Sequence, residues 1–186
     1  MTVTYAPGHS PDAVAAKFKA MAERSRNLQP VMVVAAEAVR TLMVQTFRNE
    51  SSPDGTPWAA NAQSTIDRRR AGKGAKTTKI GVDTGMLRAS LTSAPDTGRN
   101  WLSFGSNRPY AAPFHSGATR GGTLKRTAYS PPPKRSAGTA WTVTQPARPV
   151  LPVTPQGNLM TQGPAGKTFA RISAAVGKYI TTGRLR

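Results

Sequence analysis

One segment, residues 30–49, restricts the fold of this chain more than any other. Its apolar residues fall on two neighbouring helical stripes that together cover more than half of the circumference. Only Glu37, Arg40, Thr41 and Arg48 form a polar strip. At 1.5 Å per residue such a helix is roughly 30 Å long. A surface this apolar needs partners on two sides, so the segment is either a core helix or a helix shared between the core and a neighbouring subunit.

Local signals predict further helices on either side of this segment. Ser10-Pro11-Asp12 is typical of a helix start, because Ser caps the first turn and Pro suits the first helical position. A short helix is expected over 64–71. A closing helix is expected over about 165–181, where Phe169, Ile172, Val176 and Tyr179 share one face.

The remaining segments favour strands and loops. Residues 91–94 and 101–105, separated by Pro95-Asp-Thr-Gly98, predict a β-hairpin, and 140–144 predicts a short strand. Residues 117–140 have the glycines, prolines and bases of a long basic loop. A chain of 186 residues suffices for one core but rarely for two. We expect a single α+β domain over 1–186, with long N-terminal helices packed on a small antiparallel sheet, a long loop at about 117–140 and a C-terminal helix.

The distribution of charge excludes several classes of chemistry. Residues 1–96 hold thirteen bases and all eight acids, a formal charge of +5, whereas residues 97–186 hold thirteen bases and no acid, a charge of +13. Carboxylate-dependent catalysis and magnesium or calcium sites are therefore excluded from the second half. Zero Cys and two isolated His leave no thiolate nucleophile and no zinc cluster. We expect no enzyme, no metal, no cofactor and no small-molecule substrate.

The same composition argues against targeting to a membrane. The longest apolar stretch, residues 31–36, is far shorter than the roughly 20 residues that a membrane span needs. The N-terminus has neither the basic start nor the apolar core of a signal peptide. We therefore expect a cytosolic protein with no membrane partner.

Residues 163–168, Gly-Pro-Ala-Gly-Lys-Thr, resemble a phosphate-binding P-loop. The motif needs four residues between its first glycine and Gly-Lys-Thr, and here Thr161 stands where that glycine belongs. An ordinary helix start is the better interpretation.

Asp83-Thr84-Gly85 follows a short apolar run, as the catalytic carboxylate does in dimeric aspartic proteases. Arg88 nearby would suppress the proton that two such carboxylates share. A dimeric aspartic protease acting through Asp83 remains a remote alternative. The simpler interpretation is that Asp83 or Thr84 caps a short helix containing Leu87.

Two groups of bases are candidates for electrostatic contacts. Glycines lie between the bases of the first group, which could grip phosphates along a nucleic-acid backbone or simply be a solvated loop. The second group lies in the long loop and is expected to reach a neighbour. The groups are Arg68, Arg69, Arg70, Lys73 and Lys76, and Lys125, Arg126, Lys134 and Arg135. A nonspecific nucleic-acid-binding protein is thus the alternative function.

Other residues have expected roles in packing and pairing. Pro53-Asp54-Gly55 predicts a turn, after which Trp58 should fill the core. Arg88 and Arg148 are candidates for ion pairs with the few acids available, notably Glu50, Asp54 or Asp83. His115 is expected to pack or to form hydrogen bonds rather than to bind a metal.

A series of these motifs resembles a known family. In order, they are Phe47-Arg-Asn-Glu50, Pro53-Asp54-Gly55 with Trp58, residues 82–90 with Asp83, Thr84, Gly85, Leu87 and Arg88, then Gly105-Ser106, Tyr110, His115 and Gly117, and finally Pro146-Ala-Arg148-Pro149 with Leu151. Together, over roughly residues 30–155, they resemble the virion morphogenesis or tail-completion family of the Mu-like tailed phages.

The resemblance implies a structural protein of the phage neck that acts late, where the head joins the tail. The implied partners are further copies of itself in a ring, other neck proteins, and tail terminator and connector proteins. Genomic DNA in the lumen is a further implied partner, since at least eighteen of the 26 bases lack a private acid.

Overall fold

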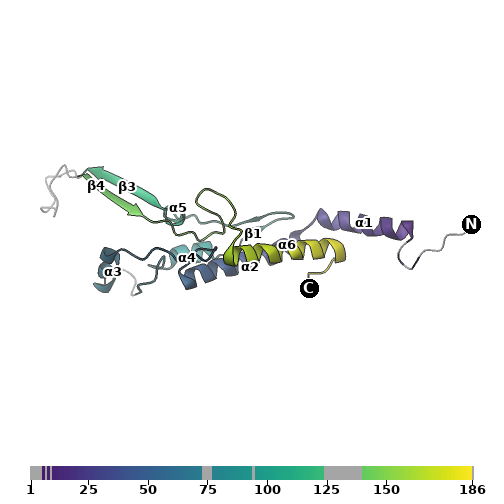
Figure 1. Ribbon diagram of the computed structural model, residues 1–186, viewed down its shortest axis with the longest axis horizontal. Coiled ribbons are helices and arrows are strands. Elements are labelled where there is room, and N and C mark those ends of the chain that lie inside the picture. The colour runs from purple at the N-terminus through teal and green to yellow at the C-terminus, as the bar shows by residue number, and fades with distance from the viewer. Residues whose placement is uncertain are drawn as a thin grey trace, which may run out of the picture.

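The computed structural model describes residues 6, 8, 10–72, 77–93, 95–123 and 140–185. These residues form an elongated α+β structure (Figure 1). Its helices are α1 (Pro11–Ser25), α2 (Gln29–Asn49), α3 (Gln63–Arg70), α4 (Met86–Leu91), α5 (Ala111–Ser116) and α6 (Gly163–Thr182). Its strands are β1 (Asp96–Thr97), β2 (Leu102–Ser103), β3 (Ala118–Thr123) and β4 (Ala140–Gln145). The α+β class predicted from the sequence is confirmed.

The N-terminal helices begin where the sequence places them. Ser10 caps α1, and its side-chain oxygen accepts a hydrogen bond from the N–H of Ala13 at 3.3 Å. Helix α2 carries Pro30 in its first turn and ends at Glu50, which adopts a left-handed conformation with φ 54°. The Glu50 carboxylate then accepts the N–H of Ile80 at 3.0 Å, which ties the end of α2 to a distant loop.

The core is built on α2 and a stack of three aromatic rings. Trp58 lies between Phe47 and Phe114, with ring centroids 5.6 and 5.5 Å away and nearly perpendicular planes. Its indole N–H donates to the carbonyl of Pro149 at 3.0 Å, so the ring is buried without an unsatisfied donor. The predicted core role of Trp58 is confirmed.

A second, smaller core joins α2 to α6. Leu42 packs with Met160 and Ala165, and the half-buried Phe169 covers them. Helix α1 is attached to the far end of α6, where the Arg24 guanidinium donates to the carbonyls of Ile180 and Thr181 at 3.1 and 3.0 Å. Arg24 thus satisfies carbonyls that the end of a helix leaves without partners.

The first hairpin is shifted from its predicted position. Strands β1 and β2 are antiparallel, but the turn between them spans Gly98 to Trp101, where the Gly98 N–H donates to the Trp101 carbonyl at 2.8 Å. The strand predicted at 91–94 is wrong, because Leu91 is the last residue of α4. Burial of Leu91 together with Leu87 on the core side of that helix favours the helical conformation.

The first part of the loop predicted over 117–140 is instead a strand of a second hairpin. Residues 118–123 form β3, paired in register with β4 so that Ala118 faces Gln145 and Thr123 faces Ala140. Pairing with β4 gives the backbone N–H and C=O groups of this segment their hydrogen-bond partners, despite its two glycines. The predicted strand at 140–144 is confirmed as β4. The rest of the predicted loop, 124–139, lies outside the described residues.

Helix α2 is both a core helix and partly exposed. By length and composition alone, α2 could cross a membrane, but the core helix of a soluble protein meets the same criteria. In α2, 44% of the most apolar 18-residue stretch is buried inside the protein. Val33, Val34 and Val44 are about half exposed on its outer side.

Candidate functional site

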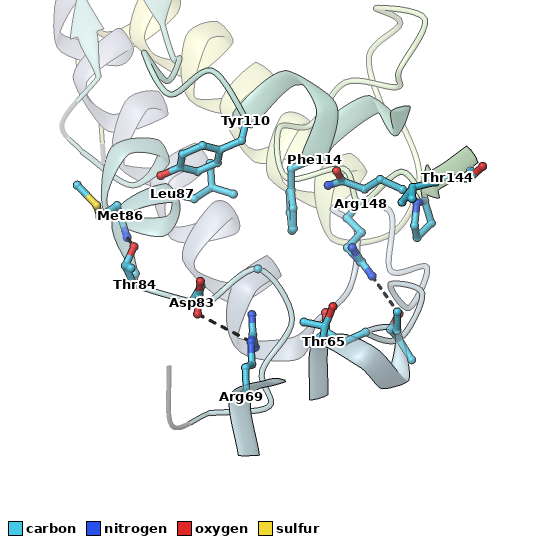
Figure 2. Close-up of a pocket in the computed structure, with 18 residues that line it drawn as sticks. Thr65, Arg69, Asp83, Thr84, Met86, Leu87, Tyr110, Phe114, Thr144 and Arg148 are labelled. Atoms are coloured by element: carbon cyan, nitrogen blue, oxygen red, sulfur yellow. Dashed lines mark hydrogen bonds and ion pairs between the residues drawn. The ribbon is translucent and has the colours of Figure 1, made fainter. Parts of the chain in front are cut away.

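A cleft of about 760 Å³ lies between α3, the start of α4, α5 and the base of β4 (Figure 2). Leu87 and Phe114 contribute to its lining from the core. Three large side chains at the cleft are substantially exposed: Met86 at 46%, Tyr110 at 44% and Val143 at 59%. The cleft therefore presents apolar surface to solvent, which is typical of a binding site.

Arg69 holds one wall of the cleft together. Its side chain is buried, and one terminal nitrogen donates to the carbonyls of Thr77 and Lys79 at 3.0 and 2.9 Å. Its Nε lies 3.9 Å from Oδ1 of Asp83, whose side chain is 45% exposed. Figure 2 shows this pair pointing toward each other across the cleft wall. Arg69 thus joins α3 to the segment before α4.

Arg148 has a different partner from the acid that the sequence suggests. Its Nε and Nη2 donate to the carbonyl of Ala59 at 3.0 and 2.9 Å, and Nη2 also donates to the carbonyl of Ala60 at 3.0 Å. The guanidinium also lies 5.8 Å from the centre of the Phe114 ring. The predicted ion pair of Arg148 with Glu50, Asp54 or Asp83 is wrong, because carbonyls of the segment after Trp58 occupy its donors. Burial lowers the pKa of Arg148, but a guanidinium remains charged at neutral pH.

His115 forms a hydrogen bond inside the fold. Its Nδ1 accepts the N–H of Val150 at 3.2 Å, which requires that this nitrogen carry no proton. Its Nε2 is buried. Burial lowers the pKa of His115, and the backbone of Val153 opposes this effect in part. The folded state therefore favours the neutral ring.

The start of α4 differs from the prediction that the side chain of Asp83 or Thr84 caps this helix. Gly85, with φ 78°, occupies the N-cap position of α4 without a side-chain bond to the helix. Thr84 Oγ1 accepts only a long bond, 3.5 Å, from the N–H of Met86. The left-handed glycine, rather than Asp83 or Thr84, turns the chain into α4. Arg88 is exposed on that helix.

The turn at Asp54 and Gly55 supports the start of α6. Asp54 Oδ1 accepts the N–H of Thr56 at 2.9 Å, and Gly55 has φ 99°. The N–H of Ala165, in the first turn of α6, donates to the carbonyl of Pro53 at 2.8 Å. Residues 163–168 are thus an ordinary helix start, as the sequence analysis favoured over a P-loop.

The motif residues near the end of the cleft pack closely together. A Cβ on Gly117, which has φ 76°, would lie 2.9 Å from the backbone nitrogen of Ala147. Gly117 therefore lets the start of β3 approach the chain that carries Arg148 and Pro149. The spacing of motifs along the sequence could not reveal this contact.

The predicted basic contacts divide into three sets. Arg68 and Arg70 are exposed on α3, whereas Arg69 is 8% exposed and belongs to the structural ion pair, so it does not join an exposed basic surface. The others lie outside the described residues: Lys73, Lys76, Lys125, Arg126, Lys134 and Arg135. Their interaction with a partner stays a prediction.

No group of three or more His, Asp or Glu able to hold a metal ion occurs within the residues that the structure describes. Sequence reasoning missed the cleft itself. Met86, Tyr110 and Val143 lie far apart in the sequence, and nothing in their local patterns indicates that they share a surface.

Comparison with known proteins decides the family. Residues 10–170 match the phage virion morphogenesis family, most of the chain's length. The chain belongs to this family. It therefore has a role in the structure or assembly of a phage virion. Neither the search of curated proteins nor the search of solved structures returned a match.

The motif residues that resemble the virion morphogenesis family lie either in the core or around the cleft. Trp58 and Leu87 lie in the main core, and Arg148 holds the backbone next to Trp58. Asp83 and Tyr110 line the cleft. The motifs on which the resemblance rests thus maintain the core and shape one surface.

Proposed function

We propose that this virion morphogenesis protein acts in head–tail joining as a structural component of the phage neck. The observation that carries the proposal is the family match over 10–170, together with motifs that resemble the tail-completion branch. A joining protein must contact different neighbours at separate surfaces. The elongated shape supports this role, because the β3–β4 hairpin and α3 lie at one end and α1 at the other (Figure 1).

The distribution of charge supports acidic subunits as the neighbours. Arg68 and Arg70 are exposed on α3, and Arg120 is exposed on β3. The chain after Asp96, which includes β3 and β4, carries no acid, so the hairpin favours acidic neck, terminator or connector subunits as neighbours. The protein works as a ring of copies in the virion neck after assembly in the host cytoplasm, with no catalytic step.

The test is a phage that carries a stop codon in this gene. We expect complete heads and complete tails to accumulate unjoined, and the purified protein to restore infectious particles when added to the mixture. Normal joining without the protein, or its absence from mature particles located by labelling, would contradict the proposal.

A second function, nonspecific binding of DNA in the neck lumen, is favoured by the same exposed arginines. A two-stranded antiparallel ribbon such as β3–β4 is of a size that the major groove of DNA admits. Binding through phosphates would weaken steeply between 50 and 200 mM salt, by about 10³-fold or more for six contacts. No binding to duplex DNA at low salt would eliminate this function.

A further inference from the structure

The outer face of α6 carries a line of bases that its own chain leaves exposed. Lys167, Arg171 and Lys178 are all exposed, and at 3.6 residues per turn they fall within about 40° of the helix circumference. At 1.5 Å per residue, the first and last of them are about 16 Å apart along the helix axis. These three residues form the basic stripe of α6.

The opposite face of α6 fixes the helix to the body of the molecule. Ala165 and Phe169 pack with Leu42 of α2, and Ile172 packs against the main core. Figure 1 shows α2 and α6 lying along the long axis of the molecule. A packed helix, rather than a loop, therefore holds the basic stripe in place.

The acids of the chain do not neutralise the basic stripe. Helix α6 has no acid of its own, because no Asp or Glu follows Asp96. Asp54 lies in the turn beside the start of α6, but its carboxylate accepts the N–H of Thr56. The ion pairs within the described residues lie inside α2 and between α3 and the segment before α4, so none of them involves α6. The positive charge of the stripe is free to attract another molecule.

The residues around the stripe distinguish DNA from an acidic protein as that molecule. The structure describes every residue of α6, and none of its large apolar side chains is exposed. Protein interfaces depend on aromatic or other large anchors near their centre, and this face has none. Ala170, Ala174 and Gly177 are exposed beside the bases instead, and such small residues let a sugar–phosphate backbone approach closely. Contacts from Lys and Arg to phosphates are typical of DNA interfaces.

We propose that the outer face of α6 binds the phosphate backbone of double-stranded DNA. A duplex carries two phosphates for about 3.4 Å of its axis, so the stripe is long enough to follow the phosphates of about five base pairs. Contacts to phosphates alone give no sequence preference. The inference rests on the proposed function, in which the genome passes through the neck, and it assigns DNA a surface separate from Arg68, Arg70 and Arg120.

Salt-dependent binding of the full chain to a duplex DNA of mixed sequence tests this surface. The triple variant Lys167→Gln, Arg171→Gln and Lys178→Gln removes the stripe and keeps good helix formers. Each lost phosphate contact lowers the slope of log affinity against log salt by about 0.9, so the slope should be smaller by about 2.7. Affinity at low salt should fall about tenfold or more. Thermal stability should stay unchanged, because all three side chains are exposed.

A matched control separates the stripe from net charge. The triple variant Lys19→Gln, Arg88→Gln and Arg99→Gln removes the same charge from exposed positions on three separate elements. Its slope should differ from that of the natural chain by less than about 1. An equal fall in both triple variants would show that net charge alone matters and would overturn the proposal. An unchanged slope in the α6 variant would also overturn it.

Cross-linking in assembled particles identifies the partner directly, because the chain has no cysteine of its own. Ala174→Cys, carrying a photoactivatable cross-linker, should form an adduct with genomic DNA. Ala15→Cys is the control, since Ala15 is an exposed alanine on α1, and should form none. Cross-linking of position 174 to a neighbouring subunit instead of DNA would assign the stripe to a protein partner and overturn the proposal. Equal DNA adducts at both positions would overturn it as well.

The outcomes separate this inference from the proposed function. Joining that requires the protein, together with unchanged DNA binding by the α6 variant, would retain the neck function and reject the α6 surface. A stripe that binds DNA in a protein dispensable for joining would retain the surface and reject the neck function. Binding that is lost only when Arg68, Arg70 and Arg120 are replaced would retain nonspecific DNA binding and reject α6 as its surface.

Discussion

At the scale of single residues, two buried arginines bind main-chain carbonyls. Arg148 is 7% exposed and Arg69 is 8% exposed, and both donate to main-chain carbonyls of loops that flank the cleft. A guanidinium suits this role because it offers five donors in a rigid plane. These side chains fasten loops that have little regular structure of their own.

Replacement of Arg148 should be costly. Arg148→Met leaves the carbonyls of Ala59 and Ala60 without their buried donors, so we expect a loss of about 2–4 kcal/mol in the free energy of unfolding. Arg88→Met is the matched control, since Arg88 is exposed, and should change stability by less than about 0.5 kcal/mol. Urea denaturation of both variants measures the difference, and equal losses would contradict the role assigned to Arg148.

His115 should make stability depend on pH. Burial lowers its folded-state pKa below the ordinary value of 6.5, so just below that value the unfolded chain binds more protons than the folded chain. The free energy of unfolding should therefore fall as pH decreases from 7 through 6.5, until the pH passes below the folded-state pKa.

Thermal melts across this range test the effect. His115→Asn keeps an acceptor for the N–H of Val150 but does not titrate, so its stability should vary less with pH than that of the natural chain. His9→Gln controls for the other histidine of the chain. An unchanged pH profile in His115→Asn would show that another group is responsible.

At the scale of elements, helix α6 depends on a glycine at its start. Gly163 has φ 58°, and a Cβ there would collide with the backbone of Asp54, so α6 can begin against the Pro53-Asp54 turn only with glycine. Its first-turn amide then donates to the carbonyl of Pro53. The helix that covers α2 is thus positioned by the turn that precedes Trp58.

Two glycines of α6 should respond in opposite directions to alanine. Gly163→Ala should lower stability by about 2 kcal/mol or more, from the strained φ and the collision with rigid backbone. Gly177→Ala should raise it by about 0.5–1 kcal/mol, because nothing lies within 4 Å of the added Cβ and alanine favours helix. Calorimetry of the two variants measures both effects, and a stable Gly163→Ala protein would contradict the contact with Asp54.

At the scale of the whole molecule, the excess of positive charge should matter more for assembly than for folding. Arg68→Glu with Arg70→Glu changes two exposed side chains, so thermal stability should move by less than about 0.5 kcal/mol per site. Head–tail joining should fall, because the reversed charges would repel acidic neighbours. Arg69→Met, in contrast, removes a buried cation and should lower stability. Normal joining by the Arg68/Arg70 variant would exclude α3 from the interface.

The sequence alone was sufficient to predict the features that depend on local interactions. Periodicity and capping predicted α1, α2 and α6, because a helix satisfies its own backbone and shows its buried face every three or four residues. The Pro53-Asp54-Gly55 turn and the core position of Trp58 were likewise predictable. The order of the motifs was enough to indicate the family.

Tertiary structure alone decided how distant segments meet. Residues 118–123 have the composition of a loop, and only pairing with 140–145 makes them a strand. Arg148 binds a carbonyl 89 residues away, a partner that no local pattern encodes. The cleft follows from the same cause. Burial is settled by the folded chain as a whole, and it leaves the apolar side chains of Met86, Tyr110 and Val143 exposed around one concave surface.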